Sequence, residues 1–223
     1  MTTASEPAPS GRVSPARAAA VLGARDPVLA RLMAEAGPMR LQRSALSPFA
    51  ALVQAIVYQQ LAGAAARAIH GRLVAAVDGD VAPEPLLALS DERLRAVGLS
   101  AAKVRSLRDL AAKVLDGTVL LSPRGLARQS DEEVTARLTT VRGIGPWSAE
   151  MFLIFQLRRL DVWPVGDLGI RRGYGLAWKV PTPTARELEP LGDRFRPYRT
   201  VAAWYCWRAA ELYGGAGASA VTR

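Results

Sequence analysis

The chain has 223 residues, of which 50% are hydrophobic and 22% charged. Its formal net charge of +9 at pH 7 fits a polyanion partner such as nucleic acid. A coding bias toward Arg and Ala would give the same excess of positive charge. The single cysteine, Cys206, excludes an internal disulfide and a four-cysteine zinc or iron–sulfur site, and the single histidine, His70, argues against a His-based metal site or a Ser-His-Asp triad. No run of about 18 uncharged apolar residues could span a membrane and the first residues lack a signal-peptide core, so we expect a cytoplasmic protein.

Short helices separated by strong caps are predicted along the chain. Residues 1–12 are rich in Pro, Ser and Ala, and we expect them to be disordered. A polar cap followed by proline then begins a helix at Ser14, Asp26 and Ser47, and the second of these helices ends at Gly37. The third reads "FAALVQAIVYQQ", and its large apolar residues fall on one helical face: Phe49, Leu52, Val53, Ile56 and Val57.

The remainder of the chain continues the helical pattern. An Ala-rich helix is expected from about Ala62 to Val77, with His70 on its surface. The segments "SDERLRAVG" and "SAAKVRSLRDLAAKVLDG" each begin with a serine cap and end at glycine. "SDEEVTARLTTV" and the C-terminal "YRTVAAWYCWRAAELYGG" are the other strong helices. The one extended candidate, "DVWPV" at 161–165, contains a proline that disfavours a strand, so the sequence predicts an all-α protein.

The stretch "TTVRGIGPWSAEMF" places two glycines and a proline between two of these helices. Glycine permits a positive φ and close approach of another backbone, and Pro146 suits the first turn of the second helix. We expect Ile144 to anchor the hairpin in the core, and Arg142 to add charge beside N–H groups that can hold a phosphate. The alternative is a plain helix–helix turn, but a basic chain favours a DNA contact, which positions a protein without reading sequence.

This stretch resembles the helix–hairpin–helix of the DNA glycosylase superfamily that carries a Gly/Pro-rich loop and an aspartate. About twenty residues later, "DVWPVGDLGIRRG" is similar to that loop with its catalytic aspartate, here Asp167. "IVYQQLAG" resembles the loop that probes the duplex, and "GLSAAKVRSLRDLA" matches a further family segment. The four segments span about 47–213, and they are most similar to the 3-methyladenine DNA glycosylase II type.

The resemblance implies a compact, two-lobed all-α fold over residues 13–215, with the helix–hairpin–helix at about 131–159 and a cleft between the lobes. Residues 216–223 are expected to be a flexible tail. The chain begins too close to this helical core to hold the N-terminal mixed α/β domain of the longer bacterial forms, so we expect the short form.

The implied reaction is hydrolysis of the N-glycosidic bond of an alkylated purine, which leaves an abasic site in base excision repair. Such a base carries positive charge and leaves as a neutral molecule, so the enzyme must chiefly stabilise an oxocarbenium-like sugar and deliver water. One carboxylate can do both, and Asp167 is the predicted catalytic residue. Asp161, at the start of the loop, is the weaker candidate, and helix capping is the structural alternative for Asp167.

The remaining site residues also follow from the resemblance. Trp147 stands where lyase relatives carry the lysine that forms a Schiff base, which implies a monofunctional enzyme. The Trp147 indole either stacks on the flipped base or belongs to the core. Gln60 is the first choice and Leu61 the second to fill the vacated stack. The other predicted base-pocket residues are Trp207, Tyr58 and Met151, with Trp204 and Tyr205 as alternatives. The predicted DNA-binding residues are Arg142, Gly143, Ile144, Gly145 and Ser148.

The implied partner is double-stranded DNA with alkylated bases, bound by a monomer near the nucleoid, with no membrane partner. No cofactor is required and no metal ligands are predicted, although the resemblance allows a monovalent cation at the hairpin carbonyls. Arg142 replaces a frequent proline, and Met151 stands where some relatives carry an aromatic residue, so the lesion among alkylated purines, ethenoadenine and hypoxanthine stays open. The alternatives are a non-catalytic helix–hairpin–helix DNA-binding protein and a lyase for oxidised bases, which would need the missing lysine and cysteines.

Overall fold

The computed structural model of the protein describes residues 13–42 and 44–215, and within these ranges every regular element is a helix. The predicted all-α fold is therefore confirmed. The predictions of disorder in 1–12 and of flexibility in 216–223 lie outside the described residues. None of the helices in the described ranges is both long enough and apolar enough to cross a membrane.

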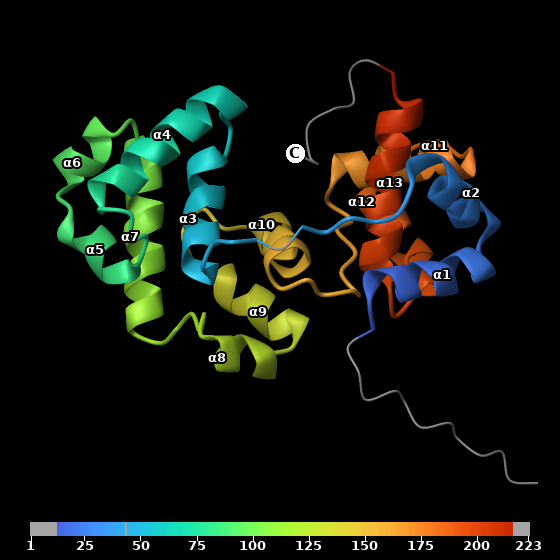
Figure 1. The fold of residues 1–223 in the computed structure, drawn as a ribbon, viewed down its shortest axis with the longest axis horizontal. Helices are drawn as coiled ribbons and strands as arrows, with labels where there is room; N and C mark the ends of the chain where they lie inside the picture. The colour runs from blue at the N-terminus through green and yellow to red at the C-terminus, as the bar shows by residue number, and fades with distance from the viewer. Residues whose placement is uncertain (1–12, 43, 216–223) are drawn as a thin grey trace, which may run out of the picture. The chain divides into compact units, whose positions relative to one another are not determined.

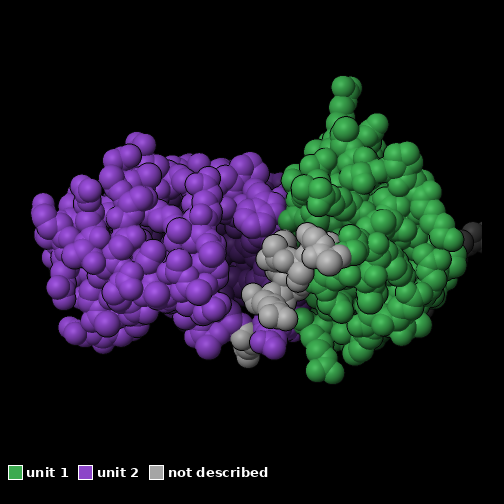
Figure 2. Space-filling model, turned by 90° about the horizontal axis from the view of Figure 1, so that it is seen from above, with its two compact units in different colours: residues 1–40, 165–223 green, residues 41–164 purple. Residues whose placement is uncertain are grey.

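The chain divides into two compact units (Figures 1 and 2). Unit 1 comprises residues 1–40 and 165–223, and unit 2 comprises residues 41–164. The helices of unit 1 are α1 (Pro15–Arg25), α2 (Pro27–Ala36), α11 (Leu168–Trp178), α12 (Ala185–Leu191), the 3₁₀ turn η2 (Asp193–Phe195) and α13 (Arg199–Tyr213). Those of unit 2 are α3 (Pro48–Tyr58), α4 (Gly63–Ala76), α5 (Pro83–Ala88), α6 (Asp91–Ala96), α7 (Ala101–Leu115), α8 (Pro123–Arg128), α9 (Asp131–Leu138), α10 (Pro146–Met151) and the π-helical turn η1 (Phe152–Gln156).

Several helices begin where the sequence places a small polar residue. The Ser14 and Asp26 side chains accept hydrogen bonds from the first-turn amides of α1 and α2, and both helices have proline in the first turn, as predicted. Ser130 and Glu133 form a capping box at the start of α9, each side chain bonding the other's backbone N–H. Local signals in the chain thus account for the starts of these helices.

Unit 1 is built around α13, which is buried on all sides from Thr200 to Trp207. It packs against α11, α2 and α1. The two helices α11 and α13 approach closely at Gly173, where an added Cβ would lie 1.7 Å from the Cys206 carbonyl oxygen. Burial raises the pKa of the Cys206 thiol, so this cysteine is an inert core residue.

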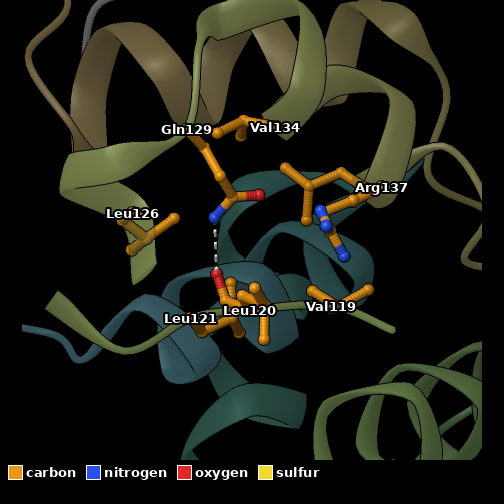
Figure 3. Close-up of a pocket in the computed structure, with 8 residues that line it drawn as sticks. Val119, Leu120, Leu121, Leu126, Gln129, Val134 and Arg137 are labelled. Carbon is orange, nitrogen blue, oxygen red and sulfur yellow. Dashed lines mark hydrogen bonds between the residues drawn. The ribbon is translucent and has the colours of Figure 1, made fainter. Parts of the chain in front are cut away.

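Unit 2 places α3 beside α7 and α4 (Figure 1). The predicted apolar face of α3 is confirmed, because its five residues Phe49, Leu52, Val53, Ile56 and Val57 are all buried. Leu107 and Leu110 of α7 complete this core. Where α8 and α9 approach the chain after α7 there is a shallow apolar recess, which Gln129 spans by donating to the carbonyl oxygen of Leu120 at 3.3 Å (Figure 3). We regard the recess as a packing feature of this unit.

Several elements differ from the sequence-based expectation. The short helices α5, α8 and α12 were not predicted, since six or seven residues are too few to show a helical period. The helix after the hairpin ends in the π-helical turn η1, which periodicity also does not reveal. Residues 161–164 form neither strand nor helix, in agreement with the proline argument.

Candidate functional site

The hairpin between α9 and α10 lies in unit 2. Ile144 is buried, as predicted, and its N–H donates to the Val141 carbonyl at 3.1 Å, closing the turn. Gly143 has a φ of 79°, in the left-handed region, whereas Gly145 is extended with a φ of −97°. The backbone conformation therefore requires glycine at position 143 but not at position 145.

Helix α7 supports the hairpin through Ser106 and Asp109. A Cβ on Gly143 would lie 2.7 Å from Ser106 Oγ, so the two segments touch at that point. Asp109 Oδ2 accepts the Arg142 N–H at 2.7 Å and also pairs with Lys113 Nζ at 2.9 Å. Burial acts to raise the pKa of the Asp109 carboxyl, but the Arg142 N–H and the Lys113 ammonium outweigh it, and the pKa lies below its ordinary value.

These contacts determine which hairpin amides face outward. Because Asp109 holds the Arg142 N–H, the available donors are the amides of Gly143 and Gly145, which make no hydrogen bond within 13–42 and 44–215. The Arg142 side chain is exposed beside them. Two free amides next to a guanidinium are a suitable setting for a phosphate oxygen.

Replacing Gly143 by Ala should destabilise the protein by about 1–2 kcal/mol, because the left-handed conformation disfavours a Cβ and the added carbon meets Ser106. Gly145→Ala is the matched control, with no heavy atom within 4 Å of its Cβ and an expected change within about 0.5 kcal/mol. Urea unfolding measures both. The affinity of Gly143→Ala for duplex DNA should fall alike for all DNA sequences. Adding Ser106→Ala to Gly143→Ala should restore part of the stability. Equal losses of stability in Gly143→Ala and Gly145→Ala would refute this account.

Helix α10 carries the three predicted residues that follow the hairpin. Trp147 is 44% exposed, so it is not a core residue, which removes one of the two readings of its indole. Ser148 and Met151 are half-buried on the same short helix. Their role in a base pocket stays a prediction.

The segment after α3 forms a tight turn that exposes the two residues predicted to enter the duplex. Gln60 has a φ of 56° and is exposed, and Leu61 is 37% exposed. Tyr58, at the end of α3, is half-buried with the His70 ring edge-on to it at 6.0 Å. The expectation that His70 is a plain surface residue is wrong: the ring is half-buried, its Nε2 has no hydrogen-bond partner among the described residues, and burial lowers its pKa.

Asp167 lies in unit 1, where it is the N-cap of α11 and only 5% exposed. Its Oδ1 accepts the Ile170 N–H at 2.9 Å and the Trp207 Nε1–H at 3.1 Å. An added Cβ on Gly169 would lie 3.0 Å from Asp167 Oδ1 and 3.1 Å from the Trp207 ring, so glycine lets the indole reach the carboxylate. Asp167 therefore caps α11, as the structural alternative predicts, and its catalytic role stays a prediction.

The two predicted aromatic residues near Trp207 are buried in α13. Trp207 is 3% exposed and touches Asp167, whereas Tyr205 donates its hydroxyl to the Gly37 carbonyl at 3.1 Å. The Trp204 ring stands edge-on to Tyr205 at 4.9 Å. The structure thus brings Asp167 and Trp207 together within unit 1. The other predicted site residues lie in unit 2: Tyr58, Gln60, Leu61, the hairpin, Trp147 and Met151.

Sequence reasoning missed the residues that support these sites. Lys103, Ser106, Asp109 and Lys113 lie on α7. The first three belong to "GLSAAKVRSLRDLA", which resembles the family only as a whole segment, and Lys113 follows it. Their spacing of three or four residues places them on one side of the helix, a signal that could have been found. Within 13–42 and 44–215, no cluster of three or more His, Cys, Asp or Glu residues could hold a metal ion.

Comparison with known proteins identifies a family and several similar glycosylases. Residues 53–197 match the family described as HhH-GPD superfamily base excision DNA repair protein. The chain is 37% identical over 187 residues to DNA-3-methyladenine glycosylase 1 of Schizosaccharomyces pombe, covering 82% of each chain. It is similar to the crystal structure of a Bacillus halodurans DNA-3-methyladenine glycosidase, with a TM-score of 0.82, 36% identity and coverage of 91% and 93%. A Schizosaccharomyces pombe 3-methyladenine DNA glycosylase in complex with abasic DNA gives a TM-score of 0.74 at 35% identity, with coverage of 88% and 98%.

Proposed function

The chain belongs to the HhH-GPD superfamily of base excision DNA repair proteins, and we propose that it is a monofunctional DNA glycosylase. It hydrolyses the N-glycosidic bond of alkylated purines, of the 3-methyladenine and 7-methylguanine type, flipped from duplex DNA, and leaves an abasic site. The relatives named as 3-methyladenine glycosylases support this substrate class, and the one bound to abasic DNA supports DNA as the partner.

The observation that carries the reaction is the setting of Asp167. The carboxylate is held at Oδ1 by a backbone N–H and an indole N–H, and its position at the start of α11 is fixed. A preorganised negative charge of this kind stabilises the oxocarbenium-like sugar without reorganising during the reaction. The same carboxylate can accept a proton from the attacking water. The cationic base needs little help to leave.

The hairpin accounts for DNA binding in this proposal. The Gly143 and Gly145 amides and the Arg142 side chain hold a backbone phosphate, which positions the duplex without reading its sequence. A non-catalytic DNA-binding module would need this hairpin alone. It would not need an indole fitted against a buried aspartate with a glycine to make room for it, and this favours the enzyme.

A monovalent cation at the hairpin carbonyls belongs to the same proposal. The carbonyls of Arg142 and Ile144 accept no hydrogen bond in the portion of the chain that the structure describes, so they suit an oxygen-coordinated cation. Such a cation would add positive charge beside the phosphate. No step of base release depends on it.

A single chain supplies one hairpin and one Asp167, so we propose that the enzyme acts as a monomer. Because the proposed substrate is chromosomal DNA, we propose that the enzyme acts in the cytoplasm at the nucleoid. The net charge of +9 suits association with a long polyanion.

The proposed function predicts base release without strand cleavage. Purified protein should free the methylated base from alkylated duplex DNA and leave the strand intact until alkali is added. Borohydride should trap no protein–DNA adduct, because Trp147 cannot form a Schiff base. Absence of base release from a panel of alkylated purines would leave the non-catalytic module, and a trapped adduct would refute the monofunctional assignment.

The same assay tests Trp147 as a base-stacking residue. Trp147→Ala should lose about 1–3 kcal/mol of transition-state stabilisation if the exposed indole stacks on the flipped base. The melting temperature should hardly change, since the side chain is not in the core. An unchanged excision rate would remove Trp147 from the pocket.

A further inference from the structure

A lysine from α7 holds the turn that follows α3. Lys103 Nζ donates to the carbonyl oxygens of Val57 at 2.7 Å and Gln59 at 3.0 Å. The last carbonyls of a helix have no partner within the helix, and a positive charge at that end is favourable. The Lys103 side chain is itself half-buried, and burial lowers the pKa of its ammonium group. The end of α3 is thus fixed by a side chain from a different helix.

Gln59 joins this turn to the phosphate-binding hairpin. Its Nε2 donates to the Gly143 carbonyl at 2.9 Å, a contact between residues 84 positions apart in the chain. Ser106, three residues after Lys103 on α7, lies directly against Gly143. The turn and the hairpin are therefore bonded to each other, and both are supported by the same helix.

The residue after Gln59 shows why this support is needed. Gln60 adopts the left-handed conformation, which is unfavourable for a residue with a Cβ and persists only where neighbouring contacts impose it. The contacts here are the Lys103 bond to the Gln59 carbonyl and the bond from the Leu61 N–H to the Tyr58 carbonyl at 3.3 Å. They set the direction in which Gln60 and Leu61 leave the protein surface.

We propose that Lys103 and Gln59 are positioning residues, which lock the duplex-probing turn (Gln59–Leu61) to the hairpin at Gly143. The turn then enters the base stack at a fixed distance from the phosphate that the hairpin holds. This inference rests on the proposed glycosylase function. It predicts that loss of either residue impairs insertion and base release, while contact with the DNA backbone persists.

The experiment compares Lys103→Met, Lys103→Arg and Gln59→Leu with Arg105→Met, a control on the same helix whose exposed side chain makes no hydrogen bond or ion pair within the described ranges. Three quantities are measured: affinity for undamaged duplex, the single-turnover rate of base release at saturating enzyme, and fluorescence of 2-aminopurine beside a tetrahydrofuran abasic analogue. Melting temperatures of all variants show whether each is folded.

Lys103→Met should bind undamaged duplex within about twofold of Arg105→Met, because each variant loses one charge. Its release rate should fall by about tenfold or more relative to that control, since small misplacements of positioned groups are costly. The 2-aminopurine signal should fall in parallel. Gln59→Leu should show the same pattern with no charge lost, and Lys103→Arg should keep most of both signals, because a guanidinium can also donate to two carbonyls.

Two results would overturn the inference. One is a release rate and fluorescence signal in both Lys103→Met and Gln59→Leu equal to those of Arg105→Met. The other is a loss of release matched by an equal loss of undamaged-duplex affinity in Gln59→Leu. Failure of the glycosylase function itself would appear differently, as absence of base release by the wild-type protein, and the fluorescence measurement does not depend on turnover.

Discussion

Asp167→Asn should release methylated bases at a rate lower by about a hundredfold or more, because the variant removes the charge that we propose stabilises the oxocarbenium-like sugar. Asparagine is an equally good N-cap, and its side-chain oxygen can still accept the Ile170 and Trp207 N–H groups. Folding and duplex affinity should therefore be nearly unchanged. Single-turnover release from methylated duplex and fluorescence anisotropy with undamaged duplex measure the two quantities.

Asp161→Asn is the matched control for this prediction. Asp161 begins the same loop and is half-buried, but it belongs to the other compact unit and does not cap α11. Its replacement should leave the release rate within a few-fold of the wild type. A large loss in Asp161→Asn with near-normal release by Asp167→Asn would exchange the roles of the two carboxylates.

Gly173→Ala should destabilise unit 1 severely. The added Cβ would lie 1.7 Å from the Cys206 carbonyl oxygen and 2.5 Å from its carbonyl carbon, and both are backbone atoms that can move only if α11 and α13 separate. Overpacking usually costs about 1–3 kcal/mol and occasionally more, and a clash between two helix backbones belongs to the upper end. Thermal and urea unfolding measure the loss.

Gly71→Ala provides the comparison, because Gly71 is also inside a helix but has no heavy atom within 4 Å of its Cβ position. Alanine favours helix over glycine by about 1 kcal/mol, so this variant should be slightly more stable than the wild type. If Gly173→Ala unfolded like Gly71→Ala, the close approach of α11 and α13 would not be a determinant of stability.

The sequence predicts well those features that depend on near neighbours in the chain. Ser14 and Asp26 each stand directly before a proline, and both cap a helix as that local pattern predicts. Ile144 was correctly assigned to the core because the hairpin around it is a local motif. The resemblance to the glycosylase superfamily, which the comparisons confirm, likewise depended on short segments with fixed order.

The contacts that sequence reasoning did not predict join residues far apart in the chain. The indole N–H of Trp207 donates to Asp167, 40 residues away, a contact that no local pattern predicts. The bond between Gln59 and Gly143 crosses 84 residues, and nothing in "IVYQQLAG" signals that one glutamine faces inward and the next outward. Such pairs arise from tertiary packing, which helical periodicity and capping residues do not reveal. The base-pocket and hairpin assignments stay predictions.

The division of the chain into units has a consequence for its synthesis. Unit 2 is one continuous segment, residues 41–164, whereas unit 1 needs both the first 40 residues and the segment from 165 onward. Domains fold as units while the chain leaves the ribosome, with N-terminal segments first. The hairpin and the probing turn can therefore form during translation, while α1 and α2 wait for α13, the helix against which they pack. A nascent chain thus completes the hairpin that we propose binds DNA before it has made Trp207, the buried hydrogen-bond partner of Asp167.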